Sequence, residues 1–214
     1  MIGKYAFAYW SIEFVCITGV AIVLSVSSVN NTWILVPAIA LIFAKVFQYR
    51  AFVRQRHLRV EEQLDILRVP LPNKGTDLRC TYHIPVKPIW GPRKLLQTFD
   101  YLPNGGGGLR QFPINKGIIG KTYQHKAPIV ENFRTDEEYR NQMMLRYNYT
   151  QEELAQRTAD RKSYLCYPLL DANHKVLGLL YFDSNQPGTF RLDEKDPTWQ
   201  MIRTASQIIC AHLI

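Results

Sequence analysis

The sequence predicts an α+β domain, with an antiparallel sheet flanked by helices, that follows a two-helix transmembrane hairpin. Three observations support this prediction. The first 49 residues are almost all apolar, short apolar segments of strand length begin near residue 77, and the chain ends in an amphipathic segment of helical period. We therefore divide the chain into a hairpin (1–49), a linker helix with its boundary (50–76) and a soluble ligand-binding domain (77–214).

Two apolar segments form the predicted hairpin. As helices, residues 6–27 and 33–49 would be ~33 Å and ~25 Å long, which is enough to cross a bilayer. Only residues 28–32 separate them, so both outer ends must lie on one side of the membrane. The second segment is followed by Arg50, Arg54, Arg56 and Arg59, and the loop carries no charge. The positive-inside rule then predicts an inner-membrane protein with both its N-terminus and its C-terminal domain in the cytoplasm.

A cleaved signal peptide is the alternative interpretation of the first apolar segment. Ser25 and Ser27 would supply the small residues of a cleavage site, but the apolar stretch is much longer than the core of a usual signal peptide.

Two charged residues lie inside the predicted spans. Glu13 is early in the first span and Lys45 is late in the second, so an antiparallel hairpin brings them to a similar depth. An unpaired charge inside a bilayer is costly, which favours a pair between them. Separate extension of each side chain to the headgroups is the alternative.

The linker is predicted to be a helix over residues 50–69 that ends before Pro70 and Pro72. Val53, Val60 and Leu67 recur every seven residues, and Leu64 follows Val60 by four. This spacing is typical of a dimerisation seam, so we expect a homodimer or a higher oligomer.

The soluble domain shows strand patterns at residues 78–86, 94–102, 163–170 and 176–183. Residues 171–175 form a tight hairpin loop in which Asn173 is expected to adopt a positive φ. Two capping boxes, Thr135 with Glu138 and Thr150 with Glu153, predict the starts of short helices. A final helix over residues 196–213 has a buried stripe made of Trp199, Ile202, Ala205, Ile209 and Leu213.

The charge and cysteine patterns limit the function. The formal net charge is +8, and residues 74–126 hold nine basic against two acidic residues, which suits an anionic ligand or an anionic lipid surface. The four cysteines form no CxxC pair, so we expect no metal, no cofactor and no disulfide framework. The GIIGKT sequence at 117–122 has two residues between its glycines where a P-loop needs four, so we expect no P-loop. We also expect no nucleic acid polymer as a partner.

Two segments of the soluble domain carry a characteristic set of residues. In segment 163–190 these are Ser163, Pro168, Leu169, Gly178, Ser184, Pro187 and Phe190. Upstream, Gly117 and Gly120 lie at a turn into a helix, and Pro128 precedes a short strand. With these positions the soluble domain resembles the GAF family over residues 78–213. The resemblance implies a GAF-like fold and a small-ligand site, without fixing the ligand, because this family binds cyclic nucleotides, haem, bilins and metabolites, or no ligand.

By analogy with GAF domains, we expect the ligand between the sheet and residues 123–161. Phe112, Tyr123, Arg134 and Tyr164 are the candidate residues for stacking and for contact with an anion. A cyclic nucleotide or a cyclic oligonucleotide is a candidate ligand, although half of the motif found in the cyclic-nucleotide branch is missing.

The architecture is similar to that of membrane effectors in bacterial nucleotide-signalling defence against phage. It implies a non-enzymatic sensor or effector in which a ligand controls the transmembrane hairpin and disrupts the membrane. Two alternatives remain open at this point. One is a membrane-anchored GAF-type redox enzyme, which requires a reactive cysteine, and the other is a passive dimerisation module without a ligand.

Overall fold

The computed structural model divides the chain into two compact units, Met1–Leu58 and Arg59–Ile214. It describes residues 59–67, 78–88, 91–103, 105–155 and 160–213, all of them in the second unit. The predicted hairpin, with Glu13 and Lys45, lies outside these residues, as does Val53. Across the described ranges, no helix is long and apolar enough to span a membrane.

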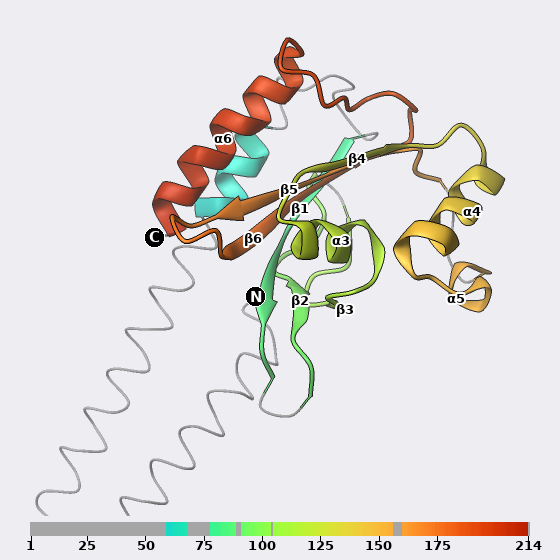
Figure 1. Cartoon of the computed structure of the whole chain (residues 1–214). Helices are drawn as coiled ribbons and strands as arrows, with labels where there is room; N and C mark the ends of the chain where they lie inside the picture. Colours follow the sequence, from blue (N-terminus) through green and yellow to red (C-terminus); the bar gives the residue numbers. More distant parts are fainter. Residues whose placement is uncertain (1–58, 68–77, 89–90, 104, 156–159, 214) are drawn as a thin grey trace, which may run out of the picture. The chain divides into compact units, whose positions relative to one another are not determined.

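One six-stranded antiparallel sheet organises the second unit, with the strand order β3-β2-β1-β6-β5-β4 (Figure 1). The central strands β1, β5 and β6 are long, and the strands toward the edges are short. Their bounds are β1 (Leu78–Val86), β2 (Lys94–Gln97), β3 (Gln111–Pro113), β4 (Ile129–Asn132), β5 (Ser163–Leu170) and β6 (Val176–Ser184).

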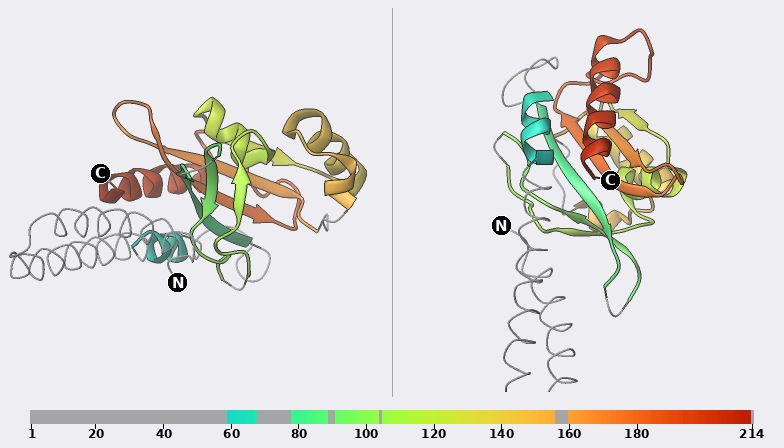
Figure 2. Two further views of the ribbon diagram at one scale, coloured as in Figure 1. Left: turned by 90° about the horizontal axis from the view of Figure 1, so that it is seen from below. Right: turned by 90° about the vertical axis from the view of Figure 1, so that its left-hand side faces the viewer.

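Helices cover both faces of this sheet. Helices α3 (Gly117–His125), α4 (Asp136–Tyr147) and α5 (Gln151–Ala155) gather on one side, where they share an apolar cluster with the sheet. Helix α6 (Pro197–Leu213) and the helical segment 59–67 lie on the other side (Figure 2). The sheet therefore separates two apolar layers, and the α+β architecture predicted for this domain is confirmed.

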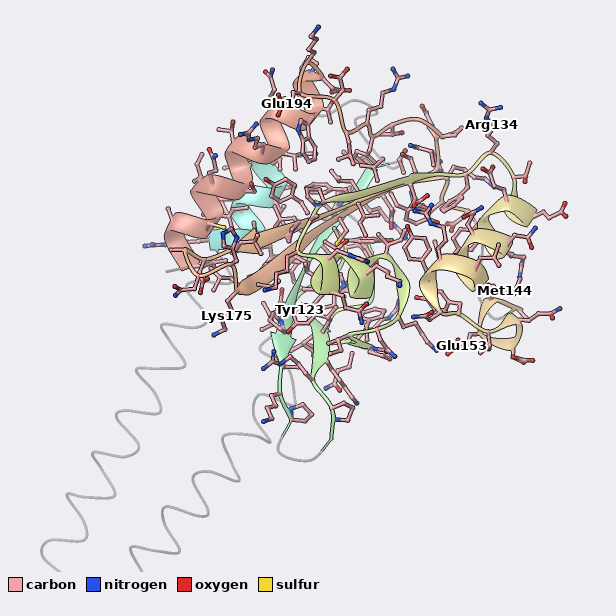
Figure 3. The ribbon with its side chains drawn as sticks, viewed as in Figure 1. Tyr123, Arg134, Met144, Glu153, Lys175 and Glu194 are labelled. Atoms are coloured by element: carbon pink, nitrogen blue, oxygen red, sulfur yellow. The ribbon has the colours of Figure 1, made fainter. Side chains whose placement is uncertain are left out.

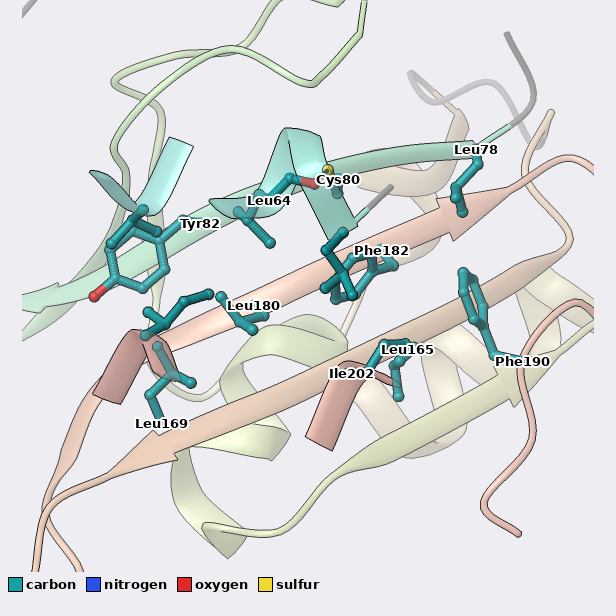
Figure 4. Packing of buried hydrophobic residues seen from close by; sticks show 13 residues of the cluster. Leu64, Leu78, Cys80, Tyr82, Leu165, Leu169, Leu180, Phe182, Phe190 and Ile202 are labelled. Carbon is teal, nitrogen blue, oxygen red and sulfur yellow. Dashed lines mark hydrogen bonds between the residues drawn. The ribbon is translucent and has the colours of Figure 1, made fainter. Parts of the chain in front are cut away.

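Side chains that alternate along the strands contribute to both apolar layers. Leu78, Cys80 and Tyr82 of β1 point into the α6 layer, where they meet Phe182 and Ile202 (Figure 4). The intervening residues of β1 face the α3 side, because successive side chains of a strand point to opposite faces. This period of two is what makes one strand line both a core and a site.

Gly178 shows how tightly the α6 layer is packed. A Cβ at this position would lie 2.2 Å from the Tyr82 ring, which is 1% exposed. Only glycine leaves room for the tyrosine, which explains the glycine at the start of β6 that contributed to the resemblance noted above.

The predicted dimerisation seam requires a correction. Val60, Leu64 and Leu67 are buried in the α6 layer of the domain itself, and the Cys80 thiol lies 3.9 Å from the Leu64 carbonyl oxygen. These three residues are therefore covered by the sheet and are not free to pair with a second helix. Their helical spacing marks a core-facing stripe, which sequence periodicity alone does not distinguish from an intermolecular seam.

The capping boxes and the hairpin loop of the domain form where the sequence predicts them, with one difference in the loop. Both capping boxes form, with the Glu138 amide donating to Thr135 Oγ1 at 3.1 Å and the Glu153 amide to Thr150 Oγ1 at 3.3 Å. In the hairpin after β5, the residue with positive φ is His174, at 54°, and not Asn173 as expected. The Asp171 carboxylate accepts bonds from the amides two and four residues later and fixes this turn one position further along.

Candidate functional site

A cavity of about 70 Å³ lies between the sheet and helices α3 and α4. A space of this size holds several waters or a small organic group. Aromatic side chains dominate its wall. The lining residues are His83, Tyr101, Phe112, Gly117, Ile118, Ile119, Tyr139, Met143, Tyr149, Tyr164 and Tyr181.

The backbone pattern explains how these residues meet. Strand alternation turns His83 of β1, Tyr164 of β5 and Tyr181 of β6 toward the α3 side. On α4, Tyr139 and Met143 are four residues apart and so share the helix face above the sheet. Gly117 begins α3 with φ of 73°, and a Cβ there would lie 2.8 Å from the Tyr149 hydroxyl, so glycine permits this close approach.

The aromatic rings hold one another in place. Tyr139 and Tyr164 are stacked, with ring centroids 6.1 Å apart and an angle of 18° between the ring planes. The imidazole of His83 meets Phe112 edge to face at 5.4 Å and Tyr181 at 5.9 Å. Such contacts fix ring orientations and give a preformed wall.

His83 is the polar feature of this wall. Its side chain is 1% exposed, and neither ring nitrogen has a hydrogen-bond partner. Burial lowers the pKa of His83 to about 3, so the imidazole is neutral at pH 7, with one donor and one acceptor nitrogen. A buried polar group without a partner costs about 1 to 3 kcal/mol.

Acid titration should reveal this buried imidazole. The folded-state pKa of about 3 lies below the unfolded value of 6.5, so the unfolded chain binds the extra proton between these values. Stability should therefore fall as the pH falls from 6.5, and by pH 5 His83 should account for a loss of about 1.5 kcal/mol. Urea unfolding at pH 6.5 and at pH 5 should show this loss of unfolding free energy in the parent and not in His83→Phe. His174→Asn, which removes an exposed histidine, is the matched control. Parallel pH profiles of stability for the parent and His83→Phe would contradict the prediction.

A charged cluster lies beside the aromatic wall. Asp183, 2% exposed, accepts two bonds from the Arg79 guanidinium at 2.9 and 3.0 Å, and Arg161 Nε lies 3.3 Å away. Burial raises the pKa of the Asp183 carboxyl, and both arginines oppose this effect. The Arg79 guanidinium also stacks over Tyr101 at 4.6 Å from the ring centroid. Asp160 lies 3.8 Å from Arg161 Nε, so the cluster holds two arginines and two carboxylates, and both guanidiniums lie against Asp183.

Polar contacts hold the connection between α4 and α5, residues 148–150, beside the cavity. Lys116 Nζ lies 2.5 Å from Glu153 Oε1, and Asn148 Nδ2 donates to the Asn115 carbonyl oxygen at 2.7 Å. At the other end of this connection, the Tyr147 hydroxyl bonds Glu131 of β4 at 2.5 Å.

The predicted site residues separate into two groups. Phe112 and Tyr164 line the cavity, whereas Tyr123 and Arg134 are not among its lining residues. Tyr123 accepts a bond from Arg93 at 2.8 Å, and Arg134 is exposed and points outward from the loop before α4 (Figure 3). A ligand role for these four residues stays a prediction.

The cysteines of the described ranges offer no reactive thiol to the cavity. Cys80 faces the α6 layer, and Cys210 lies beside the Leu170 carbonyl oxygen at 3.8 Å. Cys166 is fully buried on the cavity side of the sheet, where burial raises its pKa to about 12. A thiol of that pKa is almost entirely protonated at pH 7 and is a poor nucleophile.

The described residues thus form an antiparallel sheet with an aromatic cavity between the sheet and short helices. The sequence profile of the GAF domain matches residues 77–209, and the chain belongs to the GAF domain family. The resemblance inferred from residues 163–190 is thereby confirmed. No curated protein sequence matches the chain.

The chain is also similar to several solved structures, at low sequence identity. The type II free methionine-R-sulfoxide reductase of Thermoplasma acidophilum is 9% identical, with a TM-score of 0.53, and the match covers 76% of this chain and 94% of that one. The reduced fRMsr of Staphylococcus aureus is 16% identical, with a TM-score of 0.47, and the match covers 78% of this chain and 95% of that one. The GAF domain of a two-component sensor histidine kinase from Bacillus halodurans is 13% identical, with a TM-score of 0.48, and the match covers 72% of this chain and 92% of that one.

Proposed function

We propose that this protein is a non-enzymatic sensor whose GAF domain binds a small ligand in the aromatic cavity. The observation that carries the proposal is the cavity itself, which combines a preformed aromatic wall with an unpartnered buried imidazole at His83. The anionic ligand expected from the basic stretch stays a prediction. Within the described part of the chain, no charged side chain lines the cavity to support it.

The sheet offers a route from the cavity to the N-terminal unit. His83 faces the cavity, and its neighbour Tyr82 on the same strand packs in the layer that holds segment 59–67. A ligand that shifts β1 would therefore move contacts with Leu64 on the opposite face. Because residue 59 directly follows the first unit, this segment is well placed to transmit binding.

We further propose that the first unit anchors the protein in the membrane, on the evidence of the apolar segments 6–27 and 33–49. Control of this hairpin by ligand, in the manner of an antiviral effector, belongs to the same proposal. Single cysteines introduced at Asn30 and Lys175 should be labelled from opposite sides of sealed vesicles. Labelling of both from one side would reject the hairpin topology.

The redox alternative is less favoured by the site. A reductase of this kind needs a reactive thiol, and the described cysteines are either outside the cavity wall or buried with a raised pKa. The passive-module alternative predicts that no small molecule stabilises the domain.

Ligand-dependent melting of the full chain in detergent tests the proposed function. At least one fraction of a small-molecule cell extract should stabilise the protein, by about 2.7 kcal/mol if a ligand reaches 100 times its Kd. Phe112→Trp should reduce the effect, because the larger ring fills space at the cavity wall. Leu145→Trp places the same ring at an exposed position of α4, 78% accessible, and should retain it. Equal responses in both variants, or no response to any fraction, would contradict the proposal.

A further inference from the structure

Basic side chains gather at one end of the sheet in the second unit. The β1–β2 connection and the β5–β6 hairpin lie at this end, because β1 and β5 both run toward it and β6 returns from it. Helix α3 reaches the same end, where the Tyr123 hydroxyl accepts a hydrogen bond from Arg93 at 2.8 Å. We call residues 86–88, 91–94, 121–126 and 171–175 the basic end of the domain. It carries one acidic residue, Asp171, and six basic residues: Lys87, Arg93, Lys94, Lys121, Lys126 and Lys175.

The charges of the basic end are not balanced within the domain. In the described ranges, none of its six basic side chains forms an ion pair with an acidic residue. The Asp171 carboxylate instead accepts hydrogen bonds from two backbone amides of its own hairpin. At the other end of the sheet, by contrast, Arg79 and Arg161 both lie against Asp183. The basic end therefore presents uncompensated positive charge to its surroundings.

The spread of these charges favours an extended anionic surface over a small anion. None of the six basic residues lines the aromatic cavity, and five of them are lysines. Small anions are usually held by converging guanidinium or backbone N–H groups, whereas a lysine acts as a mobile point charge. Four of the six side chains are exposed, and they come from three separate segments of the chain: Lys87, Arg93, Lys126 and Lys175. Exposed lysines spread in this way suit a layer of anionic lipid headgroups.

The proposed membrane anchor would keep the domain close to such a layer. Nine residues, 50–58, separate the second apolar segment from Arg59, and even a fully extended chain spans only ~35 Å between these points. A tether of this length gives the two surfaces a high effective concentration. We propose that the basic end binds anionic lipid headgroups of the bilayer in which the chain is anchored. This inference rests on the proposed anchor and adds the surface through which the domain contacts the membrane.

Amide hydrogen exchange of the full chain in lipid nanodiscs tests this contact. One set of discs contains phosphatidylcholine alone, and the other contains equal parts of phosphatidylcholine and phosphatidylglycerol. Exchange at the basic end should be at least about five times slower in the mixed discs, because one basic residue at an anionic surface contributes about that factor to association. Residues 185–195, which follow β6 at the other end of the sheet, should exchange equally in both. Salt at about 0.5 M should remove the difference, because it screens charges beyond about 4 Å.

Two triple variants separate the basic end from the overall charge. The first removes one exposed lysine from each of the three segments: Lys87→Gln, Lys126→Gln and Lys175→Gln. It should lose most of the protection in mixed discs. The control removes the same charge from exposed positions beyond the other end of the sheet: Arg134→Gln, Arg191→Gln and Lys195→Gln. Figure 3 shows Arg134 on the opposite side of the domain from Lys175, so the control should retain the protection.

Other anions are tested with phosphatidylcholine discs, to which inorganic phosphate or a short DNA duplex is added. Stronger protection by either of these than by phosphatidylglycerol would overturn the inference, as would equal exchange in both kinds of disc or equal losses in the two triple variants. The proposed anchor would survive these outcomes, because it falls only if the chain does not enter the discs. In that event, flotation with phosphatidylglycerol vesicles but not with phosphatidylcholine vesicles would still support lipid binding by the basic end, and no flotation would overturn it.

Discussion

Replacement of Asp183 by Asn is expected to destabilise the domain by about 3 kcal/mol. The substitution is nearly isosteric, so it removes charge without leaving a cavity. It removes the carboxylate against which the guanidiniums of Arg79 and Arg161 lie, and their side chains are only 26% and 12% exposed. Arg161 then keeps the exposed carboxylate of Asp160 at 3.8 Å. We expect the value at the low end of the range for a broken buried ion pair, because Arg79 keeps partial access to water. Urea denaturation of the second unit within the full chain measures it.

Asp160→Asn provides the matched control. The same change of charge is made beside the same Arg161, at 3.8 Å, but the Asp160 side chain is 61% exposed. Solvent screens such a pair, so the loss should stay below about 1 kcal/mol. Equal losses for the two variants would mean that Asp183 does not stabilise the domain as a buried charge, and the cluster beside Tyr101 would need another explanation.

The long central strands could be predicted from the sequence because their alternation is regular. The predicted ranges 78–86 and 163–170 agree with β1 and β5 residue for residue, and β6 extends one residue beyond the prediction. The predicted strand 94–102 is too long. The pairing of β2 ends at Gln97, after which the Thr98 amide bonds the Tyr82 carbonyl oxygen and the chain leaves the strand. A three-residue edge strand such as β3 has too few alternations to give a signal.

The site was only partly predictable, for a physical reason. Phe112 and Tyr164 could be chosen as aromatics near the expected pocket, but the wall also takes residues from strands and helices far apart in sequence. His83 had a usable signal, since it falls in the same register on β1 as Arg79 and Thr81, opposite the apolar Leu78, Cys80 and Tyr82. Tyr139 and Met143, four residues apart on α4, gave another. Arg134 lies outside the lining, which its charge could not indicate, because a charge pattern does not show which way a loop side chain points.

Leu64→Ala should cost about 2 to 5 kcal/mol of unfolding free energy, because the side chain is 0% exposed and its removal leaves a cavity in the α6 layer. The variant tests whether segment 59–67 is part of the domain, although the GAF profile begins only at residue 77. Ile66→Ala is the matched control in the same helical segment. Its side chain is 59% exposed, so the change should be within about 0.5 kcal/mol.

The same comparison bears on signalling. If segment 59–67 is bound to the sheet by Leu64, a chain that begins at residue 77 should be less stable than one that begins at residue 59, since it loses three buried side chains: Val60, Leu64 and Leu67. A segment packed in this way is not a flexible linker, and a displacement of β1 by ligand would change its contacts with the sheet. Equal stability of Leu64→Ala and Ile66→Ala would mean that the segment is only loosely attached. The route proposed from the cavity to the N-terminal unit would then lose its physical basis.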